Sequence, residues 1–110
     1  MKKDSVIFLT HILQSINAIE RYLQDVTEKQ FENSEEKQDL AVRRLEIIGE
    51  ATKNIPMEFR EQHPEIPWKR MAGMRDVVIH QYYNVDYSII WDTVTNLLPS
   101  LKKQIEDLLS

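Results

Sequence analysis

The segment 75–83 gathers the side chains of this sequence that are best suited to moving protons and binding phosphate. They are Arg75, Asp76, His80, Tyr82 and Tyr83. An arginine carries a permanent charge on a planar fork that matches phosphate oxygens. A histidine titrates near neutral pH and can act as a general base or a general acid. Together they are sufficient to cleave a phosphodiester that carries its own nucleophile, as RNA does in its 2′-hydroxyl, without a metal.

Helical geometry limits what one copy of this segment can do. If the segment is a helix, Arg75 and Tyr82 share a face, and Asp76 and His80 pair one turn apart on a neighbouring face. Arg75 and His80 then lie about 140° apart around a straight helix. Both side chains can reach one phosphate only if the helix ends or bends near His80, or if a two-fold dimer brings in a second copy.

Structural roles for the same residues stay open at this stage. An Asp76–His80 pair is usually a surface or capping interaction, and Tyr82 and Tyr83 could be core or interface residues. Glu50 is unusual because it interrupts an apolar run, Ile47-Ile48-Gly49-Glu50-Ala51. Its carboxylate could face Arg75 across a bundle or could face water.

Other site chemistries lack the residues they need. The chain has no cysteine, so a disulfide, a cysteine nucleophile and thiolate metal sites are excluded. No glutamate stands three residues before His11, His63 or His80, as a di-iron bundle would require. Gly49 and Gly73 are isolated and form no phosphate-binding loop. We therefore expect no metal and no cofactor.

Composition and charge bound the partners. The net charge is −4, which disfavours general DNA binding, although Lys69, Arg70 and Arg75 form a local basic site that could contact RNA. No uncharged apolar run approaches the ~20 residues of a membrane span, and no secretory signal is recognisable, so we expect a cytoplasmic protein without a membrane partner.

The elements that must position these residues are helices. The chain has 110 residues and only 2 glycines, which predicts a single helical domain over residues 1–110. Apolar residues recur at helical spacing between clear breaks, which predicts an all-α antiparallel bundle of four main helices plus short helical pieces. The expected main helices cover residues 4–27, 34–54 (capped by Asn33), 67 to a break at 84–86, and 86 to the end, with a kink or restart at Pro99 and a turn of helix over 56–62.

Several motifs resemble a known family over essentially the whole chain. Arg75-x4-His80-x-Tyr82 resembles the Arg-x4-His-x-Tyr motif of HEPN-domain toxins of the HepT type. The run at 47–51, Ile66-Pro67-Trp68 before Gly73-Met74-Arg75, and Leu98-Pro99-Ser100-Leu101 resemble its other signatures. Asp76 is a departure, since a neutral Asn often follows the Arg in relatives. The carboxylate could orient His80 or could weaken RNA binding.

The resemblance implies a specific activity and specific partners. Such proteins are helical homodimers whose motifs meet in a shared cleft, and they act as metal-independent endoribonuclease toxins of a type VII-like pair. A small nucleotidyltransferase antitoxin silences them by transferring AMP to the motif tyrosine. Carried over, Arg75 would bind the scissile phosphate, His80 would be the general base or acid, and Tyr82 would be modified. Asp76, Glu50 and Tyr83 would support them, and Lys69 and Arg70 are candidate RNA contacts.

Two other hypotheses remain open. The chain could be a non-catalytic interaction module that binds a nucleotidyltransferase and serves as its substrate. It could also be a structural bundle without chemistry, which buried and mutually paired motif residues would favour.

Overall fold

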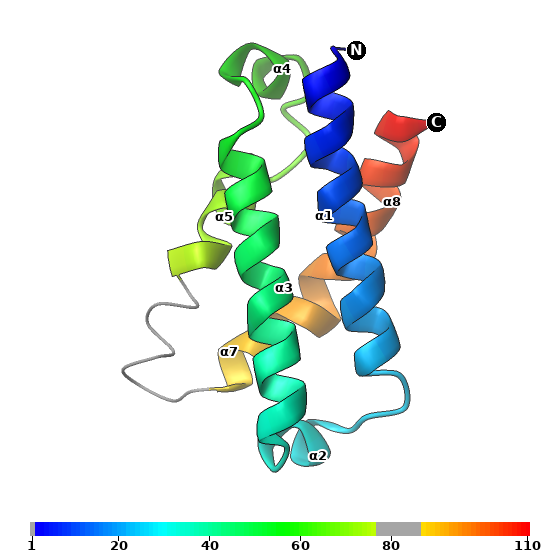
Figure 1. The fold of residues 1–110 in the computed structure, drawn as a ribbon, viewed down its shortest axis with the longest axis vertical. Helices are drawn as coiled ribbons and strands as arrows, with labels where there is room; N and C mark the ends of the chain where they lie inside the picture. The colour runs from blue at the N-terminus through cyan, green and yellow to red at the C-terminus, as the bar shows by residue number, and fades with distance from the viewer. Residues whose placement is uncertain (1, 77–86) are drawn as a thin grey trace.

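A computed structural model describes residues 2–76 and 87–110, and every regular element among them is helical (Figure 1). This confirms the predicted all-α bundle. No helix in these two ranges is long and apolar enough to cross a membrane. In chain order the elements are α1 (Lys3–Tyr22), α2 (Glu28–Glu32), α3 (Glu35–Lys53), α4 (Met57–Gln62), α5 (Trp68–Ala72), α7 (Tyr87–Asp92), the π-helical segment η1 (Thr93–Leu97) and α8 (Leu98–Leu109).

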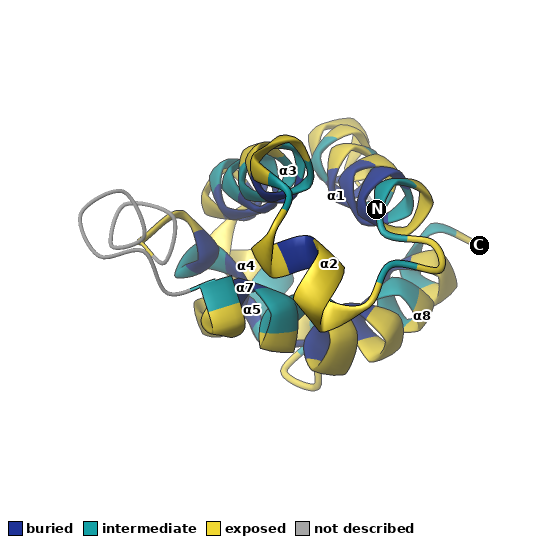
Figure 2. Ribbon diagram, turned by 90° about the horizontal axis from the view of Figure 1, so that it is seen from below, coloured by how far each residue is buried: buried dark blue, intermediate teal, exposed yellow. Residues whose placement is uncertain are grey.

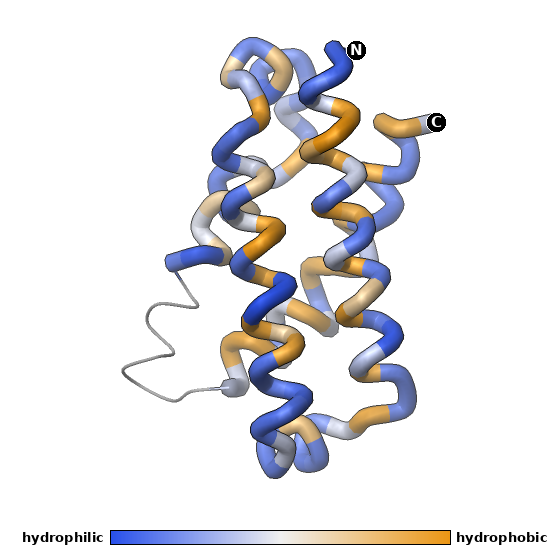
Figure 3. The backbone as a smooth tube through the Cα atoms, in the orientation of Figure 1, coloured by the Kyte–Doolittle hydropathy of each residue, from blue (hydrophilic) through white to orange (hydrophobic). Residues whose placement is uncertain are grey.

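The antiparallel pair of α1 and α3 forms the scaffold, with α8 beside α1 (Figure 1). Each long helix turns an apolar stripe toward the inside of the bundle. Hydrophobic and hydrophilic residues therefore alternate along the chain (Figure 3). The buried residues line the inner faces of the helices (Figure 2). Burying each large aliphatic side chain contributes about 1.5–3 kcal/mol. The fully buried residues of the scaffold are Leu9, Ile12, Ile16, Ile19, Leu45 and Ile48.

The first helix ends earlier than the sequence predicted, and a short helix that was not predicted lies between the first two long helices. α1 stops at Tyr22, and Asp25 adopts a left-handed conformation, with φ of 61°, in the turn that follows. Thr27 and Gln30 then form a reciprocal capping box that starts α2. Phe31 holds α2 in place, since it is completely buried and packs against the rings of Tyr87 and Trp91.

Ser34 caps α3, so the prediction of Asn33 was wrong by one residue. The Ser34 hydroxyl accepts a hydrogen bond from the backbone N–H of Lys37 at 3.2 Å. Asn33 instead donates its side-chain amide to the Lys29 carbonyl at the end of α2. The buried Gln38 fixes this junction, because its amide donates to the carbonyls of Phe31 and Glu32.

The C-terminal end of α3 is closed by Arg60, a residue of α4. α3 ends at Lys53, as the sequence predicted from Pro56. Arg60 donates from Nε to the Ile55 carbonyl at 3.1 Å and from Nη2 to the Thr52 carbonyl at 2.6 Å. The guanidinium therefore adds hydrogen bonds at the helix end, where the Thr52 carbonyl also accepts from the Ile55 N–H at 3.1 Å.

The helices at the C-terminal end follow one another without a gap, and their backbone hydrogen bonding changes from α-helical to π-helical before Pro99. α7 passes into the π-helical η1, and α8 begins at Leu98 with Pro99 in its first turn, where proline is tolerated. This is the restart predicted at Pro99. α8 is tied to α1 by an ion pair of Lys102 with Glu20 at 2.8 Å, and that hydrogen bond raises the pKa of Lys102.

Candidate functional site

Arg75 lies directly against the middle of α3. It follows α5, and Trp68, Met71 and Met74 bury their side chains in the core and so anchor this stretch. A Cβ atom added at Gly49 would lie 2.8 Å from the Arg75 backbone nitrogen and 3.1 Å from the Arg75 Cβ. A side chain at position 49 would therefore push the Arg75 backbone away from α3.

The residue after Gly49 contacts the other end of Arg75. Glu50 Oε1 lies 2.6 Å from Arg75 Nη1 in an ion pair, and each side chain remains 45% exposed. The oxygen in contact is itself shielded from water. Of the two orientations that the sequence left open for Glu50, the structure has the one that faces Arg75.

A shallow groove of about 250 Å³ runs beside this ion pair between α1 and α3. Glu50 lies at its wall, together with the charged side chains of Arg43 and Glu46 and the imidazole of His11. Phe8, Ile47, Ala51 and Asn54 complete the lining. Its lining therefore combines charged and apolar side chains.

The other predicted basic residues lie on α5, just before Arg75 in the chain. Lys69 and Arg70 are exposed, and they border an open hollow with Ile66, Pro67 and Trp68. Asp76 is also exposed, and its backbone N–H donates to the Gly73 carbonyl at 3.0 Å. Among the described residues, Lys69, Arg70 and Arg75 are thus exposed cations within one short stretch of the chain, with Asp76 as the acidic residue next to Arg75.

Part of the predicted site lies outside the described residues. His80, Tyr82 and Tyr83 belong to residues 77–86. The expected Asp76–His80 pair and the common face of Arg75 and Tyr82 therefore stay predictions. What the structure describes is the phosphate-binding half of the hypothesis.

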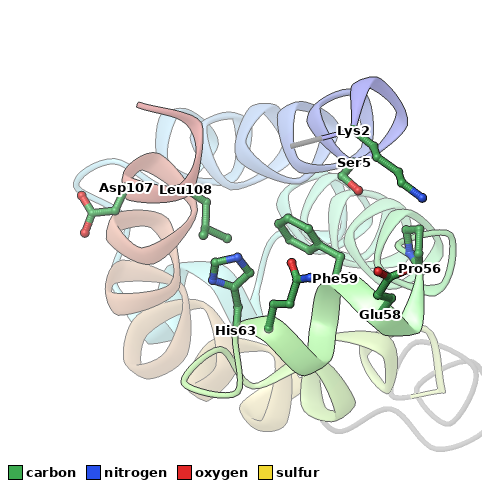
Figure 4. A pocket seen from close by; sticks show the side chains of 9 residues that line it. Lys2, Ser5, Pro56, Glu58, Phe59, His63, Asp107 and Leu108 are labelled. Atoms are coloured by element: carbon green, nitrogen blue, oxygen red, sulfur yellow. The ribbon is translucent and has the colours of Figure 1, made fainter.

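A larger cavity occurs at the end of the bundle where the N-terminus, α4 and α8 meet (Figure 4). It has a volume of about 680 Å³ and contains none of the predicted site residues. His63 faces it, with Nδ1 3.4 Å from Glu65 Oε1. The remaining lining mixes both charges with apolar groups: Lys2, Ser5, Pro56, Glu58, Phe59, Gln62, Asp107 and Leu108. Within residues 2–76 and 87–110 no group of three His, Asp or Glu side chains could hold a metal ion.

Sequence reasoning missed the role of Gly49. The signal was available, because an isolated glycine inside a helical pattern costs about 1 kcal/mol relative to alanine and often marks a close packing contact. Without the fold, however, nothing indicated which segment approaches it. The structure shows that this segment is the backbone of Arg75.

Comparison with known proteins places this chain in a family. A family model described as ribonuclease HepT-like matches residues 12–108. A protein of Thermococcus cleftensis named "Probable ribonuclease HepT" is 44% identical over 108 residues, covering 98% of each chain. A protein of Caldanaerobacter subterraneus named a "Putative RNase" is 44% identical over 102 residues, covering 93% of this chain and 91% of its own.

One relative is about twice as long as this chain. It is a Methanocaldococcus jannaschii protein named "Gamma-glutamylcyclotransferase and putative RNase", 51% identical over 105 residues. The match covers 96% of this chain but only 47% of that protein. No solved structure matches the chain.

Proposed function

This chain belongs to the ribonuclease HepT-like family, and we propose that it is a metal-independent endoribonuclease that acts as the toxin of a toxin–antitoxin pair. The relatives named as ribonucleases support the reaction class. The observation that carries the proposal is the position of Arg75, whose backbone is seated on α3 and whose guanidinium is held by Glu50 while nearly half of its side chain stays exposed.

Arg75 is the group that binds the scissile phosphate. Its guanidinium has five N–H donors, so it can donate hydrogen bonds to phosphate oxygens while it stays in the ion pair with Glu50. As the 2′-oxygen attacks phosphorus, negative charge increases on the equatorial oxygens, and a fixed cation stabilises that charge without reorganising. The exposed Lys69 and Arg70 extend the positive surface along the RNA backbone.

His80 moves the protons in the proposed reaction. As a general base it takes the proton of the 2′-hydroxyl, the new P–O2′ bond forms, and the P–O5′ bond breaks. A general acid then protonates the leaving 5′-oxygen. The products are a 2′,3′-cyclic phosphate and a 5′-hydroxyl, so no water and no metal is consumed in this step.

A homodimer supplies both proton carriers. Base and acid are two different groups, and a two-fold axis near the motif would place one His80 from each protomer on one phosphate. The chain would then work as a composite cleft between two copies. We expect this dimer in the cytoplasm, where its RNA substrate is.

A nucleotidyltransferase antitoxin is the proposed regulator. Transfer of AMP to the Tyr82 hydroxyl, with pyrophosphate as the leaving group from ATP, would add a negative charge and a nucleotide close to the motif. This modification would block RNA by occupying the cleft and by pairing with Arg75 in place of phosphate.

The test is digestion of total cellular RNA in EDTA by wild-type protein and by His80→Ala, with the cut ends mapped. We expect cleavage by the wild type alone, leaving 2′,3′-cyclic phosphates. An intact mass first establishes that the protein carries no AMP. An unmodified wild-type protein that fails to cleave would contradict the proposal and favour a non-catalytic module that the nucleotidyltransferase binds and modifies.

A further inference from the structure

Glu50 and Gly49 contact opposite ends of the same arginine. Gly49 leaves room for the Arg75 backbone, which lies so close that an added Cβ would be 2.8 Å from its nitrogen. Glu50 Oε1 lies 2.6 Å from Nη1 at the tip of the side chain. Two consecutive residues of α3 therefore fix the positions of both the backbone and the guanidinium of Arg75.

A long side chain held at both ends has few conformations left. A free arginine on a surface would lose about 1.5–2 kcal/mol of rotamer entropy on binding a ligand. Ordering it beforehand offsets only part of what a competing carboxylate takes from RNA binding, but it fixes the guanidinium where negative charge develops on the phosphate. The α3 helix is well suited to do this, since it is the longest element that packs against Arg75 and its own core residues are buried.

We propose that Glu50 is a positioning residue for Arg75, and that its carboxylate orders the guanidinium for the phosphate while also competing with it. This proposal rests on the proposed function for its kinetic consequence. The competition follows from charge, because the carboxylate is the same kind of partner for the fork as a phosphate. Removing the negative charge should therefore strengthen RNA binding and weaken catalysis at the same time.

This pair of opposite effects separates positioning from general support of the fold. A residue that only stabilises the protein changes the melting temperature and lowers kcat without improving binding. A residue that only repels RNA changes KM and leaves kcat alone. Glu50→Gln keeps the size and one hydrogen-bond acceptor but removes the charge, so it isolates the ion pair.

Glu46 provides the matched control. It lies one turn before Glu50 on α3, borders the same groove and is also partly buried. Within the described residues the ion pair of Arg75 is with Glu50. Glu46→Gln therefore removes the same charge from nearly the same place without releasing the guanidinium.

The experiment compares wild type, Glu50→Gln and Glu46→Gln. We measure kcat and KM on RNA, affinity for a 2′-O-methyl RNA that cannot be cleaved, and the order of Arg75 from the heteronuclear NOE of its side-chain Nε–H. For Glu50→Gln we expect kcat to fall about tenfold or more, affinity for the uncleavable RNA to rise about two- to fivefold, and the Arg75 Nε–H to become mobile. Glu46→Gln should keep the wild-type kcat and an ordered Arg75.

The outcomes distinguish this proposal from the function on which it rests. If wild type cleaves and Glu50→Gln behaves as Glu46→Gln does in kcat and in Arg75 order, Glu50 is no positioning residue and the proposal is overturned. If wild type does not cleave but Arg75 becomes mobile only in Glu50→Gln, the positioning stands and the proposed function fails.

Discussion

Two arginines contact α3, and their environments are opposite. Arg60 lies at the C-terminal end of α3 and donates to the backbone carbonyls of Thr52 and Ile55. Arg75 lies at the middle of α3 and meets one carboxylate, that of Glu50, with nearly half of its side chain exposed. The first arginine completes the hydrogen bonding of a helix end, whereas the second is fixed in place with its surface accessible.

This difference shows how to recognise a functional cation in a bundle rich in charge. An arginine whose fork is bound to main-chain carbonyls has a structural role, because losing those hydrogen bonds would destabilise the fold. An arginine seated on a carboxylate can exchange that anion for another. Both residues carry the same charge, so only their contacts in the structure distinguish the structural role from the functional one.

The largest expected effect comes from removing each arginine in turn. Arg75→Ala should lower cleavage by about 10²–10³-fold, since a charge-stabilising donor is lost, while stability changes by less than about 1 kcal/mol because the ion pair is half exposed. Arg60→Ala should leave kcat intact but lower the free energy of unfolding by about 1–3 kcal/mol. RNA cleavage and urea denaturation measure the two losses.

Two results would contradict these separate roles of Arg75 in cleavage and Arg60 in stability. An Arg75→Ala protein that cleaves at the wild-type rate would remove Arg75 from the site. An Arg60→Ala protein that is inactive yet fully stable would give the helix-capping arginine a catalytic part that its contacts do not indicate.

The second effect concerns the glycine beneath Arg75. Gly49→Ala should destabilise the protein by about 1–2 kcal/mol, because the overpacking at the Arg75 backbone exceeds the gain in helix propensity. Cleavage should fall about tenfold or more, since Arg75 is displaced from Glu50. Thermal denaturation and cleavage assays test both.

Gly73→Ala is the matched control for this substitution. An added Cβ at Gly73 would be 3.3 Å from the Lys69 carbonyl oxygen and 3.5 Å from that of Arg70, contacts within one short turn. We expect stability to change by less than about 0.5 kcal/mol and cleavage to persist. Equal damage from both glycines would mean that the approach of Arg75 to α3 is not what Gly49 protects.

The smallest effect is expected from the exposed cations of α5. Lys69→Ala and Arg70→Ala should each weaken RNA binding modestly and reduce the slope of log affinity against log salt by about 1, without changing stability. Binding of uncleavable RNA at several salt concentrations measures this slope. A slope unchanged in both variants would place the RNA backbone away from α5.

The long helices and the short α4 could be predicted from sequence, whereas α2 depended on tertiary contacts. The apolar spacing of α1 and α3 is local information, so both were found within a few residues except for the early end of α1. α2 was missed because Phe31 is a single apolar residue in a polar stretch. Its burial comes from Tyr87 and Trp91, which lie far away in the chain.

The site was predictable in its residue types but not in its geometry. Arg75 could be singled out from its neighbours in sequence, whereas the orientation of Glu50 depended on how closely α3 approaches a segment 25 positions later. That approach is set by the absence of a side chain at Gly49, a steric fact that no periodicity contains. Ser34 against Asn33 was a choice between two adjacent good caps, which the contacts of Gln38 decide.

The most direct test of the central claim observes both arginines while RNA binds. The side-chain Nε–H signals of Arg75 and Arg60 are assigned with Arg75→Lys and Arg60→Lys, and 2′-O-methyl RNA is then titrated into wild-type protein. The account predicts a saturable shift of the Arg75 signal with the Arg60 signal unmoved. An Arg75 signal that stays in place while the RNA is bound would contradict it.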